Sequence, residues 1–296
     1  MNRSDIFSFN KYLAQGKNHK SSNIVLQDYC EHYYDKINKF SLIVLSDGAG
    51  SCKYSHYGSK TIVNSTIDFF KENYINIFSY SEEEIKLKIV KYLSKDIDST
   101  ADKNGFNVKD LYATLLFVFC YKEKYIYGHI GDGIICSDTK SGLKLISKGI
   151  GGEFKNETVF FHKDINIDNF LLEIKPIDDI LSFYCFSDGL EPILISFKND
   201  KLSEILSTFS YWIDNYEYNY VFDNIKVNLD EIAEETPSIY DDLSLIIMNI
   251  NTVENIKIRN TNEKIREKKD LESSANISSA NNVSKQENIS ATNNVS

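Results

Sequence analysis

Short apolar runs that end at an aspartate followed by glycine recur along the chain. Each run is rich in Leu, Ile, Val, Phe or Tyr, and the aspartates that follow are Asp47, Asp132 and Asp188. A fourth acidic site, Asp241–Asp242, comes just before the apolar residues 243–250. Apolar runs of this length bounded by glycine are typical of buried strands. The pattern therefore predicts carboxylates at or near the ends of four strands.

Other stretches have helical spacing. Apolar residues recur every three or four positions over 54–78, and again from Ile85 to Ile97. Ser81 and Glu84 have the spacing of a capping box, which predicts that the second helix begins there. Further helices are expected over 191–196, 202–213 and 229–235. Strands are expected over 7–15, 24–34, 40–45, 111–121, 125–136, 143–146, 158–161, 170–174, 181–186 and 243–250, and a loop over 16–22.

The order of these elements indicates the fold class. Strands come first, two helices follow, then a hairpin around residues 122–124, and then more strands and helices. This order favours two antiparallel sheets with helices on the outside. The chain has 296 residues, of which 42% are hydrophobic, so it can bury a large core. We expect one domain over residues 1–252.

The remaining residues, 253–296, have a different character. Residues 254–269 are charged and compatible with a helix, and residues 272–296 are rich in Ser and Asn. The latter composition cannot bury enough apolar surface to order itself. We therefore expect a disordered tail that is dispensable for catalysis, so that truncation after Asn251 leaves activity nearly intact.

Charge and cysteine usage exclude several classes of protein. The formal net charge is −10, which argues against a general nucleic-acid binder. The five cysteines are scattered without a Cys-x-x-Cys pair, as expected for reduced thiols in a cytoplasmic protein. The N-terminus lacks a signal pattern, and no apolar stretch is long enough to span a bilayer. We expect no membrane association.

The aspartates themselves suggest metal chemistry. A lone Asp-Gly pair is usually a turn. Here three such pairs follow strongly apolar strands, and no basic cluster matches them. Converging carboxylates without cationic partners favour hard divalent cations such as Mg²⁺ or Mn²⁺, which prefer oxygen ligands.

Six motifs in order resemble the metal-dependent PP2C-type (PPM) serine/threonine protein phosphatases. The motifs are Gln27-Asp28, Asp47-Gly48-Ala49-Gly50, Ala113-Thr114-Leu115-Leu116, Gly131-Asp132-Gly133, Ser187-Asp188-Gly189 and Asp241-Asp242-Leu243-Ser244. A bacterial subgroup is similar in two more features, Gly16 with His19 and the segment Gly152-Glu153-Phe154-Lys155-Asn156-Glu157-Thr158. The match covers roughly residues 8–250.

The resemblance implies an α-β-β-α sandwich with metal ions at one end. It implies Asp47 as the bridging ligand of two Mn²⁺ or Mg²⁺ ions, completed by the Gly48 carbonyl. Asp188 and Asp241 would hold the second ion, and Asp132 with Asp188 a third, weaker one. Asp28 would act through metal-bound water. The catalytic set would be Asp47, Asp188 and His19.

The sequence also departs from the family pattern. Ala49 stands where many members have a histidine that protonates the leaving group, and Gln27 where many have Glu. Asn23 occupies the expected position of the arginine that clamps phosphate, so His19 is the candidate for that contact. Pro192 replaces an aspartate that often contributes to the third metal site, with Glu191 one residue earlier.

The resulting prediction is a metal-dependent phosphatase that hydrolyses phosphoserine or phosphothreonine in proteins. Its partners would be a phosphorylated protein and the serine/threonine kinase that installs the phosphate. The alternatives are a catalytically weak phosphoprotein-binding regulator with the same fold, motivated by Gln27 and Ala49, and a scaffold that acts through its tail.

Overall fold

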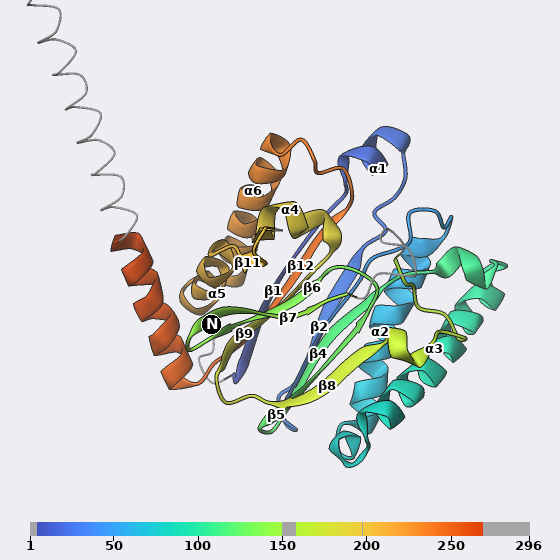
Figure 1. The fold of residues 1–296 in the computed structure, drawn as a ribbon, viewed down its shortest axis with the longest axis horizontal. Coiled ribbons are helices and arrows are strands. Elements are labelled where there is room, and N and C mark those ends of the chain that lie inside the picture. Colours follow the sequence, from blue (N-terminus) through green and yellow to red (C-terminus); the bar gives the residue numbers. More distant parts are fainter. Residues whose placement is uncertain (1–4, 150–157, 197, 269–296) are drawn as a thin grey trace, which may run out of the picture.

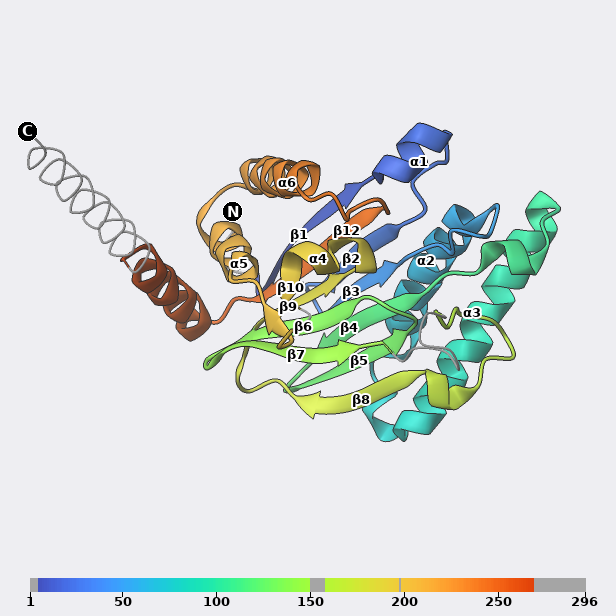
Figure 2. The same cartoon turned by 45° about the horizontal axis from the view of Figure 1, so that its top comes forward.

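Two antiparallel sheets lie face to face with helices on both outer sides, which confirms the predicted α-β-β-α architecture (Figure 1). The computed structural model describes residues 5–149, 158–196 and 198–268. Sheet A has the strand order β1-β12-β9-β6-β7, and sheet B has the order β2-β3-β4-β5-β8. A turned view separates the two sheets from the helices on either side (Figure 2).

The element bounds agree with most of the expected ones. Sheet A contains β1 (Phe7–Ala14), β6 (Ile134–Thr139), β7 (Gly142–Lys148), β9 (Ile180–Phe186) and β12 (Leu243–Ile250). Sheet B contains β2 (Tyr29–Asp35), β3 (Phe40–Ser46), β4 (Leu115–Tyr121), β5 (Lys124–Ile130) and β8 (Leu171–Pro176). The longer helices are α2 (Ser55–Asn73), α3 (Glu82–Asn104), α5 (Ile205–Asn215) and α6 (Tyr218–Glu235). Shorter elements are α1 (Lys17–Ser22), α4 (Glu191–Leu194), β10 (Ile195–Ser196) and β11 (Lys201–Leu202), with 3-10 turns at Ile77–Ser79, Val108–Leu111, Ile167–Asn169 and Asp188–Leu190.

Strand β3 is buried on both faces, which explains why its sequence is continuously apolar. Leu42 and Val44 face α2 and α3, whereas Ile43 and Leu45 face sheet A. Side chains that alternate across a strand in this way need apolar residues at every position when both faces are covered. The core is therefore three apolar layers, one between the sheets and one beneath each pair of helices.

Helix α3 begins where the sequence predicts. The Ser81 hydroxyl accepts from the Glu84 backbone N–H at 3.2 Å, and the Glu84 carboxylate accepts from the Ser81 N–H at 2.8 Å. This capping box satisfies the first backbone donors of the helix. Ile85, Ile89 and Leu93 then form the buried stripe that packs towards α2 and sheet B.

Several sequence expectations were wrong. Residues 16–22 contain the short helix α1 instead of a loop, and residues 158–161 form no strand. The expected strand over 125–136 is divided into β5 and β6 by the turn at Gly131–Gly133, where both glycines have positive φ (104° and 86°). That conformation is easily reached only without a Cβ. As a result, the hairpin partner β5 stays in sheet B while β6 joins sheet A.

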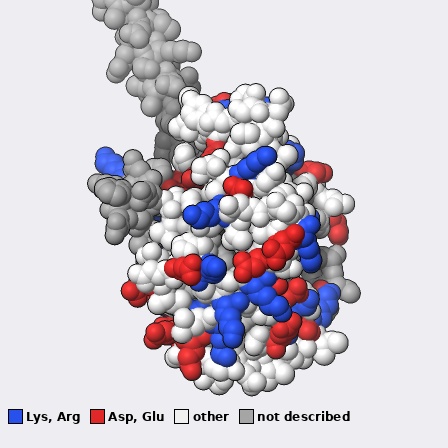
Figure 3. Space-filling model, turned by 90° about the vertical axis from the view of Figure 1, so that its right-hand side faces the viewer, with Lys and Arg blue, Asp and Glu red and all other residues white. Residues whose placement is uncertain are grey.

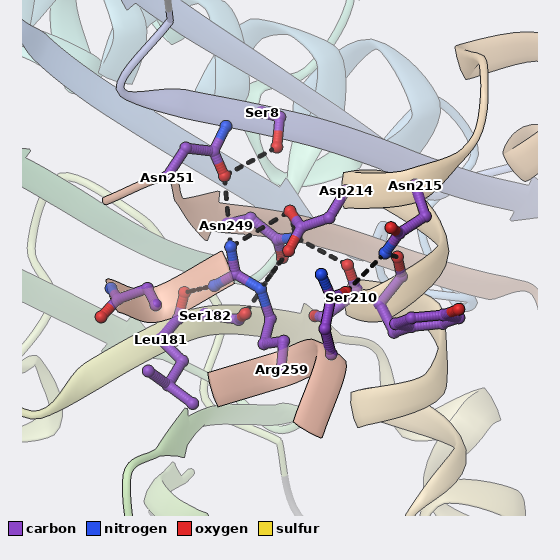
Figure 4. Close-up of polar contacts among 12 residues, drawn as sticks. Ser8, Leu181, Ser182, Ser210, Asp214, Asn215, Asn249, Asn251 and Arg259 are labelled. Atoms are coloured by element: carbon purple, nitrogen blue, oxygen red, sulfur yellow. Dashed lines mark hydrogen bonds and ion pairs between the residues drawn. The ribbon is translucent and has the colours of Figure 1, made fainter. Parts of the chain in front are cut away.

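A helix over residues 253–268 follows β12 and packs against the domain. Its Arg259 is fully buried and forms a bidentate ion pair with Asp214 of α5, at 2.6 and 3.1 Å (Figure 4). Arg259 also donates to the backbone carbonyl of Leu181 at 2.6 Å, and Asn249 donates to Asp214 at 2.9 Å. The first part of the expected tail is thus packed structure. The Ser- and Asn-rich part, residues 272–296, lies outside the described residues.

The surface over α2 and α3 is charged but of mixed sign. Lys and Arg side chains are interleaved with Asp and Glu on this face (Figure 3). Among the described residues, every helix is too short or too polar to cross a membrane.

The buried ion pair generates a stability prediction. Arg259→Ala leaves Asp214 buried without its cation, and the loss of one partner of such a pair costs about 3–5 kcal/mol of unfolding free energy. Urea denaturation of Arg259→Ala is expected to show this loss. The control is Lys257→Ala on the exposed face of the same helix, which should stay within about 0.5 kcal/mol of wild type.

Truncation gives an independent check of the same contacts. Truncation after Asn251 removes Arg259 and should destabilise the domain, contrary to the expectation from sequence alone. Truncation after Lys268 keeps every described contact and should leave the midpoint of urea denaturation unchanged. Equal midpoints for both truncations would show that the helix contributes nothing.

Candidate metal centre

Three of the predicted aspartates converge at one end of the sandwich. Asp47 follows β3, Asp132 follows β5, and Asp188 follows β9. One carboxylate oxygen from each lies within 4.8 Å of the others. The apolar strands bring these residues together because both sheets end at the same side of the core.

Backbone hydrogen bonds fix the Asp47 loop. The Asp47 N–H donates to the Thr114 hydroxyl at 2.8 Å, and the Thr114 N–H donates to the Asp47 carbonyl at 2.8 Å. Gly48 is packed so closely that a Cβ would lie 2.9 Å from both the Gln27 carbonyl oxygen and the Ser55 hydroxyl. Glycine is therefore required here, and its carbonyl remains a candidate ligand.

The Asp132 loop is fixed by two residues whose contacts the sequence did not reveal. The Thr158 hydroxyl donates to the Asp132 carboxylate at 2.5 Å. His129 is buried, and burial lowers its pKa to about 4, so the ring is neutral at physiological pH. Its Nε2–H donates to the Asp132 carbonyl at 3.0 Å, while Nδ1 accepts from the Ser147 hydroxyl at 2.8 Å. His129 is thus a positioning residue for this loop.

Asp28 adds a fourth carboxylate, and it is almost fully buried. Burial raises the pKa of Asp28 to about 6, and the charge of Asp242 adds to that rise. The nearby Asp47 and Ser244 oppose that rise. Neither carboxylate oxygen of Asp28 has a hydrogen-bond partner among the described residues. Asp28 and Asp47 therefore need either a shared proton or a cation between them.

Burial and repulsion between carboxylates both raise pKa values at the centre. Burial raises the pKa of Asp47 well above its usual value, and the charges of Asp28 and Asp188 raise it further. Burial and the charge of Asp132 raise the pKa of Asp188 to about 7. The charges that act most strongly on both groups are other carboxylates.

Glu191 shares this environment. Burial and the charge of Asp132 raise its pKa to about 7, against a smaller opposing effect of Lys148. The sequence pointed to Glu191 only as the residue before Pro192, and the structure places it within electrostatic range of Asp132. Glu191 is therefore a candidate to replace the missing aspartate at position 192.

The donor set fits divalent oxygen-seeking cations. The candidate ligands are carboxylates and one backbone carbonyl, and Asp28 and Asp188 retain buried oxygens without a hydrogen-bond partner in the described structure. Mg²⁺ and Mn²⁺ prefer such ligands. A cation at this place would relieve both the repulsion and the missing hydrogen bonds.

Asp241 and Asp242, the two aspartates before β12, have different roles. The Asp241 side chain is 56% exposed, and its charge contributes to the raised pKa values of Asp47 and Asp188. Asp242 is buried, and its carboxylate accepts from the backbone N–H groups of Gly16 at 2.7 Å and Gln27 at 2.6 Å. Asp242 therefore joins three chain segments, a role that the Asp-Asp sequence did not distinguish from that of Asp241.

His19 lies beside this pair instead of inside the three-aspartate cluster. It is a buried residue of α1, with Nδ1 at 2.9 Å from Asp242 and Nε2 at 4.0 Å from Asp241. Gly16 allows α1 to come this close, since a Cβ there would lie 2.3 Å from the Asp241 backbone. The ion pair with Asp242 orients the ring so that Nε2 faces the Asp241 side.

The comparison with protein families assigns the chain. The model of the family described as Protein phosphatase 2C matches residues 15–229. The chain belongs to this family.

Individual relatives are distant in sequence. Serine/threonine-protein phosphatase 3 of Escherichia coli strain K12 is 23% identical over 148 residues, which is 49% of this chain. The match spans only 58% of the length of that relative.

Solved structures share the fold over most of the chain. The serine/threonine phosphatase Stp1 from Staphylococcus aureus has a TM-score of 0.54 at 14% identity, covering 82% of this chain and 94% of that one. The catalytic domain of the phosphatase PstP, solved with two manganese ions, has a TM-score of 0.52 at 13% identity, covering 82% and 97%.

The raised pKa of Asp188 predicts a pH-dependent stability of the metal-free protein. The folded state retains a proton up to about pH 7, whereas an unfolded aspartate loses it near about pH 4. Folded stability therefore falls as pH rises through this window. In a chelator, Asp188→Asn should melt at a higher temperature than wild type at pH 8, and the difference should shrink towards pH 5.

Metal addition should reverse this effect. Mn²⁺ competes with protons for the carboxylates, so it should raise the melting temperature of wild type more at pH 8 than at pH 5.5. The measurement is thermal unfolding by circular dichroism. A melting temperature that does not change when Mn²⁺ is added at pH 8 would contradict the presence of a metal centre.

Proposed function

We propose that the protein is a metal-dependent serine/threonine protein phosphatase that uses Mn²⁺ or Mg²⁺. The observation that carries the proposal is the cluster of Asp28, Asp47, Asp132 and Asp188, which gathers negative charge at one end of a PP2C-type fold and forms no ion pair with a lysine or arginine among the described residues. Family membership and the manganese ions of the PstP catalytic domain support the same reading.

Each carboxylate has a place in this proposal. Asp47 would be the ligand shared by two ions, because its carboxylate lies near those of Asp132 and Asp188 and the charge of Asp28 also acts on it. The Gly48 carbonyl would complete the ligands of one ion, and Asp188 with Asp241 would hold the second. Two such ions, when bound, activate a water molecule for in-line attack and neutralise the phosphate.

A third, weaker ion is assigned to Asp132 and Asp188. Glu191 is added as a candidate ligand, because the charge of Asp132 acts on its carboxyl group. Thr158 and His129 hold Asp132 in position for this ion. Asp28 contributes through hydrogen bonding to ligand water.

His19 is proposed as the residue that contacts phosphate. Its Nδ1 lies 2.9 Å from Asp242, and its Nε2 faces the side of Asp241. Ala49 is buried and has no proton to donate, so protonation of the leaving group depends on water or on His19.

The proposed substrates are phosphoserine and phosphothreonine in proteins, and the implied partner is the kinase that installs them. We propose a cytoplasmic location, in keeping with the five unpaired cysteines. The second candidate is a phosphoprotein-binding regulator with weak catalysis, favoured by Ala49 and by Gln27, whose side-chain oxygen has no partner in the described residues. Metal-dependent turnover of an aryl phosphate separates the two.

The central prediction concerns Asp47. Asp47→Asn should lower metal-dependent turnover of a phosphothreonine peptide by several orders of magnitude, because the bridging ligand is lost. The same variant should melt at a higher temperature than wild type in a chelator, because a like charge is removed. Asp98→Asn, an exposed position on α3, serves as the matched control and should behave as wild type. Normal turnover by Asp47→Asn would refute the metal mechanism.

The role of His19 is tested with two leaving groups. If His19 contacts the non-leaving oxygens, His19→Ala raises KM on a phosphothreonine peptide and on an aryl phosphate alike. If His19 is instead the general acid that protonates the leaving group, His19→Ala lowers kcat only for the peptide, by about 10²–10⁴-fold. The reason is that an alkoxide leaving group needs a proton more than a phenolate does. Unchanged kinetics on both substrates would leave His19 with a purely structural role beside Asp242.

A further inference from the structure

A pocket of about 520 Å³ lies next to the metal centre, between the chain around residues 23–27 and the loop and helix start at residues 50–57. Its wall includes Gln27, the neighbour of Asp28, and Gly50, three residues after Asp47. Through these two residues the pocket adjoins the proposed metal centre.

The lining is apolar and aromatic. Tyr54 and Phe106 stack with ring centroids 3.8 Å apart, and Tyr57 meets Phe106 edge-on at 5.1 Å. Ile24 and Val25 complete the wall, although their side chains are 37% and 53% exposed. Exposed apolar side chains gathered around one hollow are typical of an interaction site.

The charge of the pocket differs from that of the metal centre. Lys53 is the one charged residue among those that line it, and its ammonium lies over the Tyr54 ring at 4.9 Å. The described lining contains no carboxylate, whereas the adjoining centre is built from carboxylates. A neutral apolar group is therefore favoured here over a cationic one.

Both walls are held in place before any ligand binds. The Ser59 hydroxyl donates to the Gln27 carbonyl at 2.6 Å, and the Tyr54 N–H donates to the Asp110 carbonyl at 3.0 Å. The Ile24 N–H donates to the His19 carbonyl at 2.9 Å. A preformed pocket loses little conformational entropy on binding.

Two polar atoms in the wall are unused. Gln27 Oε1 and His56 Nδ1 are buried and have no hydrogen-bond partner among the described residues. The wall of the pocket thus combines apolar side chains with two buried polar atoms that have no partner among the described residues.

We propose that this pocket binds an apolar or aromatic side chain of the phosphoprotein substrate, one or two positions from the phosphorylated residue. An extended chain advances about 3.3–3.6 Å per residue, so a near neighbour of the phosphoresidue reaches the adjoining pocket. The inference rests on the proposed phosphatase function and names the sequence preference of that site.

The test compares phosphothreonine peptides that carry Phe, Gly or Asp at each of the two positions on either side of the phosphoresidue. With Mn²⁺ present, kcat/KM should favour Phe over Gly by about tenfold at one position, mainly through KM, as is usual for an apolar subsite. Tyr57→Ala and Val25→Ser should reduce this ratio towards one. Tyr220→Ala, which removes an exposed tyrosine from α6, should keep it.

Three outcomes would overturn the proposal. The first is a Phe-to-Gly ratio of kcat/KM near one at every position in wild type, and the second is a preference for Asp. The third is a Phe preference that remains in both Tyr57→Ala and Val25→Ser. If no peptide is hydrolysed, the same peptides are titrated into wild-type protein. A Phe preference in Kd that Tyr57→Ala abolishes then upholds the pocket and refutes the phosphatase, whereas equal Kd values refute both.

Discussion

The burial and mutual repulsion of clustered carboxylates are the constraint on which the functional end of this protein depends. Asp28, Asp47 and Asp188 all have raised pKa values because burial and neighbouring acids disfavour their charged forms. The three apolar layers behind them supply the stability that tolerates this strain. A divalent cation would offset this repulsion. The sandwich is thus a rigid scaffold that holds several carboxylates close together.

Asp242 connects the surrounding chain segments to that scaffold. Its single carboxylate accepts from two backbone N–H groups and pairs with His19. In this way the end of β1, the approach to β2 and the start of β12 share one buried anchor. The pocket beside Gln27 is fixed through the same anchor, so the proposed sites for metal, phosphate and the neighbouring substrate side chain would be physically coupled.

Much of this was predictable from the sequence. The helices α2 and α3, the capping box at Ser81 and the apolar strand β3 formed where expected, because local pattern and tertiary burial agree there. Helix α6 was expected only over 229–235 and begins earlier, at Tyr218. The helix α1 was missed because its residues are polar, and its contacts with Asp241 and Asp242 come from far along the chain. Arg259 was missed for a related reason. A charged stretch normally indicates solvent exposure, and only the distant Asp214 and Leu181 explain its burial.

The pairing of β1 with β12 sets an order of assembly during translation. Phe7 is opposite Ile250, and β12 lies between β1 and β9, so sheet A stays open until almost the whole domain has left the ribosome. Sheet B needs only residues 29–176 and can form earlier. Contacts between distant parts of a chain are slow to form. Since Asp241 and Asp242 arrive with the last strand, a nascent chain would hold an incomplete centre, and activity would appear only on release of the finished domain.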